Sequence, residues 1–431
     1  MKKYGEYITT DNKFITQIPS AWKLKLGLSL FAENKDKNDN LQNTNQLQFC
    51  YGTIIKKSNQ SIEQDNIDVV KKYTIVQCND IMLNGLNLNY DFVSQRVAIV
   101  PESGIITSAY LSLRCRDVYN PFYANYLLKA LDARKVFHGM GSGLRLTLSY
   151  AEFSRIKFPV PPRSEQDQIV RYLDYKTAKI DKLISGYKRQ IELLEERKRA
   201  ILDDVVIHGL ANNTDFTAVE FSWIDKIPKH WKLMRAKNLY KKEKRPPLEN
   251  DEIVTCFRDG EVTLRKNRRT TGFTESLQEN GYQHICKGDL VIHVMDAFAG
   301  SIGVSDSDGK GTPVYSCCTP IKENTVDNYY FMYVLRKMAY SGYIQSLYRG
   351  IRERSTNFTF EIFAQQLLPV PPLDEQKTIV RYISDENRKI DNLKAKVEKQ
   401  ITLLQEYRTR LISDVVTGQV DVRDEVIPEM R

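Results

Sequence analysis

Apolar residues recur every seven positions in two stretches of the chain, residues 163–206 and 373–416. In the first stretch the column is Leu173, Ile180, Tyr187, Leu194 and Ile201. In the second stretch it is Ile383, Ile390, Val397, Leu404 and Leu411. Charged residues flank both columns, and sustained seven-residue spacing of this kind is typical of coiled-coil helices. The pattern therefore predicts two long helices with one narrow apolar seam each.

A second column is expected to complete each seam, at Ile169 and Leu183 and at Ile379 and Leu393. Gln190 and Gln400 interrupt this column. A buried polar layer at these glutamines could set the register of the pair at some cost in stability. The alternative is that the two glutamines lie at the edge of the seam.

Both predicted helices follow a Pro-Pro pair, which favours extended backbone in the residue before it. Ser164 and Asp374 then offer side chains suited to cap a helix N-terminus. The acidic Glu165 and Glu375 fall in the first turn, where the helix dipole favours negative charge. We expect the helices to begin at these caps.

The two helical stretches belong to an internal repeat. Residues 158–206 align without a gap on residues 368–416, and 22 of the 49 aligned positions are identical. The repeat extends weakly upstream, where Ile18-Pro19 and Trp22-Lys23 return as Ile227-Pro228 and Trp231-Lys232. A repeat of this length means two copies of one unit.

Two similar helices of equal length in one chain are most simply buried against each other. A pseudo-twofold axis between the units would make the helices antiparallel. Forty helical residues rise about 60 Å, so the pair is expected to hold the globular parts apart at a fixed distance.

The globular parts contain short β-rich runs broken by Gly, Asn and Asp, such as 74–76, 96–100, 290–294 and 313–317. One helix is expected near the end of each part, over 122–133 and 329–338. The predicted fold class is α+β, with twisted, mainly antiparallel sheets. The first globular domain is expected over residues 1–158 and the first helix over 159–208. The second globular domain is expected over 209–367, and the second helix with a C-terminal tail over 368–431.

The composition adds modest constraints. The 431 residues carry a net charge of +9 with a pI of about 8.9, a weak indication of nucleic-acid binding. Seven cysteines without a C-x-x-C pair fit a reducing compartment. Neither a signal peptide nor an apolar run of membrane-spanning length is visible, so we expect a soluble, cytoplasmic protein.

Basic residues cluster in the second globular domain, in the segments 257–273 and 348–354. Arginine forks can bind phosphates or guanine edges, and each of these residues could equally be a solvated surface charge. The candidate DNA-binding residues of this domain are Arg258, Arg265, Lys266, Arg268, Arg269, Arg349, Arg352 and Arg354. In the first domain the weaker candidates are Lys56, Lys57, Arg96 and, in a glycine-rich loop, Arg145.

Recognisable catalytic motifs are absent from the sequence. It has no N/D-P-P-Y/F motif for base methylation and no phosphate-binding G-x-x-x-x-G-K-[ST] loop. His284, Cys286 and His293 lie close in sequence but lack a recognised ligand spacing, so no metal site is expected. The sequence predicts a binding protein without catalytic residues.

The motifs together resemble one family. I-P-x-x-W-K opens each variable domain, P-V-P-P-x-x-E-Q closes it, and a long helix ends in D-V-V followed closely by glycine. This duplicated pattern resembles the specificity subunit of type I restriction-modification systems, over essentially the whole chain. Residues 287–316 also resemble a recurrent version of that family's second recognition domain. One departure is that the first helix reaches its glycine, Gly209, one residue later than the second reaches Gly418.

The resemblance implies a complete arrangement. Each globular part would be a target recognition domain for one half of a bipartite, asymmetric double-stranded DNA site. The helices would set the spacer and dock two methyltransferase subunits, which use S-adenosylmethionine to methylate adenine. Endonuclease subunits driven by ATP and Mg²⁺ would join them, and the chain itself would bind no cofactor.

Two alternatives remain at this point. A DNA-binding enzyme fused to its own specificity domain requires a cofactor or nuclease motif, and none is visible. A coiled-coil scaffold that binds only proteins is separated from a DNA-recognition protein by DNA-binding assays with the methyltransferase partner.

Overall fold

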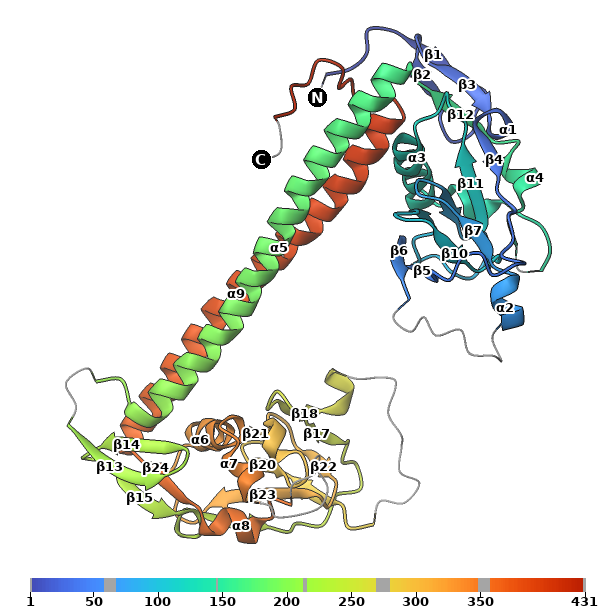
Figure 1. Ribbon diagram of the computed structural model, residues 1–431. Coiled ribbons are helices and arrows are strands. Elements are labelled where there is room, and N and C mark those ends of the chain that lie inside the picture. The colour runs from blue at the N-terminus through green and yellow to red at the C-terminus, as the bar shows by residue number, and fades with distance from the viewer. Residues whose placement is uncertain are drawn as a thin grey trace. The chain divides into compact units, whose positions relative to one another are not determined.

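The chain folds into two compact units. The computed structural model describes residues 2–57, 67–144, 146–211, 215–268, 280–347 and 357–428. The first unit comprises Met1–Lys188 and Glu398–Arg431, and the second comprises Arg189–Val397. The division crosses two long helices, α5 (Arg163–His208) and α9 (Leu373–Val416). Each unit therefore contains one globular part and its own portion of the helix pair (Figure 1).

Within each unit α5 and α9 pair in opposite directions. In the first unit Nη1 of Arg408 lies 2.5 Å from Oδ1 of Asp181. In the second unit Nζ of Lys198 lies 2.9 Å from Oδ1 of Asp391. Since Asp181 aligns with Asp391 in the repeat, and Arg408 with Lys198, the same ion pair is formed once in each unit. The predicted antiparallel, pseudo-twofold pairing is confirmed.

The first apolar column lies in the seam as predicted. Of the second column, Ile169 and Ile379 are fully buried, whereas Leu183 and Leu393 were assigned wrongly. Leu183 and Leu393 are 53% and 47% exposed, and Gln190 and Gln400 are exposed as well. A coiled-coil seam alternates steps of three and four, so the second column lies four residues after the first. Its members are Thr177, Ile184, Ile191, Lys198 and Val205 on α5, and Asn387, Lys394, Ile401, Arg408 and Val415 on α9.

Charged side chains in this corrected column, rather than the glutamines, define the register. Lys198 and Arg408 form the two equivalent ion pairs. Lys394 forms a third pair in the second unit, 2.7 Å from Oε1 of Glu195. The repeat places Ile184 and Gln405 at the corresponding positions of the first unit, which cannot form an ion pair. The exposed glutamines fit the alternative that they lie at the seam's edge.

The helix starts also differ from the expected caps. α5 and α9 begin at Arg163 and Leu373, one residue before Ser164 and Asp374. The carbonyl of Pro162 accepts hydrogen bonds from the backbone amides of Glu165 and Gln166. The carbonyl of Pro372 does the same in the copy. The second proline of each pair therefore provides the first helical carbonyl, because its fixed φ suits a helix start.

The repeated Glu-Gln pair joins each helix to its own globular part. Glu165 is buried and accepts from the hydroxyl of Tyr4 at 2.5 Å and from Nε1 of Trp22 at 3.0 Å. Gln166 accepts from the backbone amide of Asn120, which is the N-cap of helix α3 (Pro121–Ala133). In the second unit Glu375 accepts from Nε1 of Trp231, and Gln376 accepts from the amide of Asp327. The spacing of W and E-Q in the repeat is explained by these contacts.

A four-stranded antiparallel sheet forms the centre of each globular part. In the first unit the strand order is β4 (Phe31–Glu33), β11 (Leu111–Cys115), β8 (Ile81–Leu83), β9 (Val97–Ile99). In the second unit it is β16 (Tyr240–Glu243), β23 (Tyr315–Pro320), β20 (Leu290–His293), β21 (Ile302–Val304). The antiparallel sheets and the α+β fold class agree with the sequence prediction.

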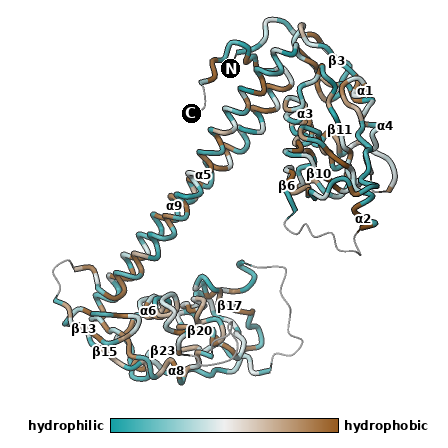
Figure 2. The backbone as a smooth tube through the Cα atoms, viewed as in Figure 1, coloured by the Kyte–Doolittle hydropathy of each residue, from teal (hydrophilic) through white to brown (hydrophobic). Residues whose placement is uncertain are grey.

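One helix packs against each central sheet, α3 (Pro121–Ala133) in the first unit and α6 (Asn328–Tyr340) in the second. Their apolar faces join the main core of each unit, which also contains Trp22 or Trp231. Figure 2 shows hydrophobic residues gathered along these sheets and helices, whereas α5 and α9 alternate between hydrophobic and hydrophilic positions. Both helices lie where the sequence predicts them.

Among the described residues, two-stranded antiparallel ladders complete each unit, four per unit, and they correspond one to one. In the first unit they are β1 (Tyr7–Thr9) with β2 (Gln17–Pro19), β3 (Lys23–Leu26) with β12 (Lys157–Val160), β5 (Leu47–Cys50) with β6 (Thr53–Lys56), and β7 (Thr74–Val76) with β10 (Gly104–Ile106). In the second unit they are β13 (Phe216–Phe221) with β14 (Ile224–Pro228), β15 (Lys232–Arg235) with β24 (Leu367–Val370), β17 (Val254–Cys256) with β18 (Val262–Leu264), and β19 (Gln283–Ile285) with β22 (Gly309–Gly311). The two globular parts share one topology although their sequences differ.

The last two ladders of each unit enclose a second, smaller core. In the first unit it includes Leu47, Ile54 and Met82, and in the second Val254, Val262 and Val291. Met82 lies on β8 and Val291 on β20, so these ladders pack against the central sheets.

Short helices fill the connections. The α-helices are α1 (Gly27–Leu30), α2 (Ile67–Lys71), α4 (Tyr150–Phe153), α7 (Tyr343–Ser346) and α8 (Phe360–Gln365). The 3-10 helices are η2 (Val136–Gly139), η3 (Ala236–Asn238), η4 (Arg265–Asn267) and η5 (Ala297–Ala299). Across the described ranges, no helix combines the length and apolar character needed to cross a membrane.

Candidate nucleic-acid interface

The candidate basic residues of the second unit that the structure describes lie on one hairpin. Arg258 lies in the turn between β17 and β18, and Arg265, Lys266 and Arg268 follow β18 directly. The turn is tight, because Gly260 has a φ of +86° and a Cβ there would meet the Arg336 guanidinium. The hairpin thus carries four of the candidate basic residues, and their contacts with DNA stay a prediction.

Carboxylates accompany these cations. Arg258 lies 3.0 Å from Oδ1 of Asp296, and Lys266 pairs with Glu252. Arg268 lies 2.8 Å from Asp259 and 2.9 Å from Glu261.

Two of the arginines also make uncharged contacts. The guanidinium of Arg268 stacks 4.3 Å from the ring centre of Phe257. Arg265 donates to Oγ1 of Thr255 at 3.2 Å. The hairpin is therefore rich in arginine yet partly neutralised by acids within it and next to it.

Lys56 and Lys57 of the first unit lie on the corresponding hairpin. Lys56 ends β6, Lys57 follows it, and both are exposed. The turn between β5 and β6 presents Tyr51, which is 85% exposed, followed by Gly52 with a φ of +74°. An aromatic residue and a left-handed glycine thus occur in both turns, as Tyr51-Gly52 here and Phe257 with Gly260 in the second unit. The fold places basic residues of both units at the end of equivalent strands, β6 and β18, or just after them.

The placement of Arg96 does not support a DNA contact. Its side chain is completely buried. Its guanidinium donates to the carbonyls of Asn84, Leu86, Asn87 and Asp91, at 2.7 to 3.4 Å. Arg96 therefore fixes the loop before β9, a role that its position at a β-rich run did not reveal.

The other candidates, Arg145, Arg269, Arg349, Arg352 and Arg354, lie outside the described residues. Their DNA-binding role stays a prediction.

The structure adds one arginine in each unit that the sequence did not single out. Arg114 on β11 binds both carboxylate oxygens of Asp80 at 2.9 Å, and Arg245 after β16 binds Asp289 at 2.5 Å. Asp80 and Asp289 are both buried and occupy equivalent positions before β8 and β20. The repeated aspartate was visible in the sequence, but its partner was not, because the arginine comes from different strands of the sheet.

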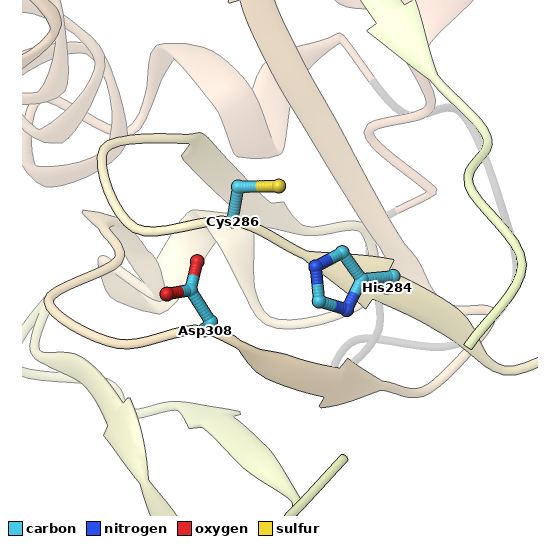
Figure 3. A group of neighbouring side chains, drawn as sticks. All are labelled: His284, Cys286 and Asp308. Carbon is cyan, nitrogen blue, oxygen red and sulfur yellow. The ribbon is translucent and has the colours of Figure 1, made fainter. Parts of the chain in front are cut away.

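A small cluster of metal-binding residue types lies where β19 ends and β22 begins: His284 is on β19, Cys286 follows it, and Asp308 precedes β22 (Figure 3). The ligand atoms of His284, Cys286 and Asp308 lie within 4.8 Å of one another. His293 is not part of this group; it lies on β20, 3.8 Å from Asp296, and burial lowers its pKa. The third residue of the cluster is therefore one that sequence spacing did not suggest.

The chain thus consists of two α+β units of one topology, each with a basic hairpin and each tied to one helix of an antiparallel pair. Comparisons identify the class. The type I restriction modification DNA specificity domain matches residues 31–193 and 228–403, so it covers both units and most of the chain. The chain belongs to this family, and it is a non-catalytic DNA sequence-specificity subunit of a type I restriction-modification system.

Individual relatives are distant but span nearly the whole chain. The MjaVIII type I restriction enzyme specificity subunit of Methanocaldococcus jannaschii is 22% identical over 373 residues, 83% of each chain. Among solved structures, the HsdS subunit of Thermoanaerobacter tengcongensis matches 94% of this chain and 98% of its own, with a TM-score of 0.51 and 14% identity. A chain from a structure of type I restriction-modification complex assembly matches 94% and 99%, with a TM-score of 0.60 and 13% identity. These similarities confirm the fold.

Proposed function

We propose that each globular part recognises one half of a bipartite, asymmetric double-stranded DNA site. The observation that carries this proposal is the common position of the basic hairpins, β5–β6 with Lys56 and Lys57, and β17–β18 with Arg258 to Arg268. The strands keep one topology while the side chains differ, as expected of two domains that bind the same polymer but different bases. Arginine and lysine at such hairpins suit phosphate contacts and guanine edges.

The acids on the second hairpin favour selective binding. Arg268 must exchange or share Asp259 and Glu261 when it contacts a phosphate, and exposed ion pairs of this kind are worth only about 0–1 kcal/mol. Replacing these ion pairs by a phosphate contact therefore costs little free energy. The two acids nevertheless reduce the attraction of the free hairpin for DNA of any sequence. Specific base contacts then account for a larger share of the affinity.

An exchange of recognition domains tests the half-site assignment. Residues 226–366 are replaced by the corresponding domain of a relative, and the methylated bases are sequenced in cells that carry the methyltransferase. One half of the site is expected to change while the other half is retained. Simultaneous change of both halves would contradict independent recognition.

The helix pair is proposed to set the length of the DNA spacer between the half-sites. The support is the register of ion pairs in each unit and the uninterrupted length of α5 and α9. Inserting four residues after Lys188 lengthens one helix by about 6 Å. We expect a changed spacer or lost recognition with the same half-site bases. An unchanged spacer with full activity would refute this role.

The same helices are proposed to dock two methyltransferase subunits. Leu183 and Leu393, exposed although apolar, precede the seam residues Ile184 and Lys394 and so lie on one flank of the seam. Asp181 and Asp391 follow seam residues and lie on the other flank, where they form ion pairs. The first flank thus presents an exposed leucine in each unit, between polar and charged residues such as Gln190 and Arg197.

The repeat places an equivalent apolar patch in each unit. In an antiparallel pair the residues that precede seam positions on the two helices lie on the same side of the pair. Leu403 of α9 therefore lies on the side of Leu183 in the first unit, and Leu193 of α5 lies on the side of Leu393 in the second. These leucines are 46% and 48% exposed. Two equivalent patches favour two copies of one partner.

Substitutions of the flank leucines test the docking. Leu183→Asp and Leu393→Asp are each expected to remove one methyltransferase subunit, and the double variant both, when the complex is weighed by light scattering. Leu28→Asp, an exposed leucine of α1, is the matched control. Retention of both subunits by the double variant would contradict these patches.

In the assembled complex we propose that S-adenosylmethionine is bound by the methyltransferase subunits and ATP with Mg²⁺ by the endonuclease subunits. The chain then contributes recognition and spacing alone. This division agrees with the membership of the chain in a specificity-subunit family. A cytoplasmic location is proposed on the same ground.

A further inference from the structure

The cluster of His284, Cys286 and Asp308 lies on one face of a two-stranded ladder. β19 and β22 pair antiparallel, with His284 opposite Lys310 and Ile285 opposite Gly309. Cys286 and Asp308 are therefore opposite each other one step further along the ladder. Side chains two residues apart on a strand share a face, which brings His284 to the same side as Cys286.

The ring of His284 is held in a defined orientation. Its Nδ1 lies 2.7 Å from Oδ2 of Asp251, and both side chains are largely buried, with 13% and 7% exposed. Figure 3 shows the other ring nitrogen directed toward the side of Cys286 and Asp308. A histidine whose Nδ1 proton is donated to a carboxylate presents a lone pair at Nε2, an arrangement common behind metal-bound histidines.

The surroundings favour a cation. The carboxylate of Asp308 lies within 4.8 Å of the Cys286 thiol, and that of Asp289 accepts the backbone amide of Cys286 at 2.9 Å. Asp289 is engaged by Arg245, and one oxygen of Asp308 accepts the backbone amide of Lys287 at 2.8 Å. The second oxygen of Asp308 remains available to a ligand.

We propose that His284, Cys286 and Asp308 bind a Zn²⁺ ion. One imidazole nitrogen, one thiolate and one carboxylate form a ligand set that zinc accepts, with a fourth position for water. Tetrahedral zinc needs ligand atoms about 3.3–3.8 Å apart, so rotations that close about 1 Å complete the site. This assignment differs from the sequence prediction, because the third ligand reaches the site through strand pairing and not through spacing.

The first unit supplies an internal comparison. Its matching ladder, β7 with β10, carries Ile75, Gln77 and Ser103 where the second unit carries His284, Cys286 and Asp308. The carbonyl of Asn45 accepts the backbone amide of Ile105, and in the second unit the carbonyl of Glu252 accepts that of Lys310. Asn45 therefore corresponds to Glu252, and Thr44 corresponds to Asp251. The fold does not need these four residues, and they occur together in one unit only.

The ion would join the segments of His284 and Asp308, and the segment of Asp251 is linked to them through the His284 ring. Asp251 leads into β17, while His284 and Asp308 belong to the adjoining ladder that shares the small core. Zinc bound to the second unit would therefore stabilise the small core that supports the hairpin of Arg258 and Arg268. Only this last consequence for DNA rests on the proposed function.

Zinc binding by the whole chain tests the proposal without DNA or partners. The purified chain is titrated with zinc chloride against a chromophoric chelator, and cobalt chloride is used to detect thiolate-to-metal absorption. We expect one zinc per chain, lost in Cys286→Ser and in Asp308→Asn, and an affinity about 10–100-fold lower in Asp251→Asn. Cys78→Ser, at an exposed cysteine of the first unit, is the control that keeps full binding.

Asp308 is exposed, so its variant is expected to keep the fold, which circular dichroism verifies. Binding that is unchanged in both Cys286→Ser and Asp308→Asn would overturn the site, as would a wild-type chain that takes up no zinc at micromolar concentration. Neither outcome bears on DNA recognition, which is measured separately by the domain exchange.

Discussion

Replacement of Arg268 by alanine distinguishes a phosphate contact from a base contact on the second hairpin. The side chain stacks on Phe257 and pairs with Asp259 and Glu261, and 35% of it is exposed. Losing two exposed ion pairs and one cation–π contact costs less than about 2–3 kcal/mol of stability. The unit is therefore expected to remain folded, so a change in DNA binding reports the contact itself.

The expected effect on DNA binding follows from counterion release. Each phosphate contact contributes about 0.9 to the slope of log affinity against log salt concentration. Between 50 and 200 mM salt, the parent complex should thus lose about 3.5-fold more affinity than the Arg268→Ala complex. A base contact instead costs about 1–3 kcal/mol at one position of the site and leaves the slope nearly unchanged.

The assay is fluorescence anisotropy of the assembled methyltransferase on cognate and single-base-variant DNA across a salt series. Lys322→Ala, at an exposed lysine of the same unit, controls for the loss of one positive charge. Glu261→Gln should have the opposite effect and raise affinity for DNA of unrelated sequence. An Arg268→Ala complex that matches the parent in slope, affinity and specificity would refute the assignment of this hairpin.

Three further predictions concern stability. Glu165→Ala leaves the buried donors of Tyr4 and Trp22 unpaired, at about 1–3 kcal/mol each, whereas Glu375 is 26% exposed and water can replace it. Hydrogen exchange at the start of α5 should therefore rise more in Glu165→Ala than at the start of α9 in Glu375→Ala, and equal effects would contradict this account. Arg96→Met should destabilise the loop of residues 84–96 by about 2–4 kcal/mol, seen as faster exchange there, because four carbonyls lose their donor. Backbone hydrogen bonds, chiefly from Ser94, lower the pKa of Asp91 to about 2. The ionised Asp91 therefore stabilises the folded loop at pH values above the unfolded pKa of about 3.9, and this stabilisation is lost as the pH falls through 2. Asp91→Asn should accordingly make hydrogen exchange in this loop less dependent on acid pH.

The repeat and its spacing were sufficient to predict most of the architecture. Two copies of one unit, an antiparallel helix pair and the positions of α3 and α6 follow from local periodicity and from the equality of the two halves. These features depend on residues close in sequence, so one chain reveals them. The same local information placed Lys56, Lys57 and the arginines from Arg258 to Arg268 as candidates, and their DNA contacts stay predictions.

The structure decided which faces of the helices meet. The seven-residue spacing is compatible with two choices for the second column, and only the packed pair shows that Leu183 and Leu393 point outward while Lys198 and Arg408 lie in the seam. An apolar column does not by itself show which neighbouring column packs against the partner helix, because exposed apolar residues can instead bind another protein.

Tertiary contacts between distant segments decided the rest. The sequence by itself determined the duplicated architecture, since a repeat and a heptad are properties of neighbouring residues. The burial of Arg96, the pairing of Arg114 with Asp80, and the approach of Asp308 to His284 and Cys286 join residues 5 to 34 positions apart through strand pairing and loop packing. Spacing along one chain cannot show such contacts, because strand register and side-chain direction are set only when the sheet is complete.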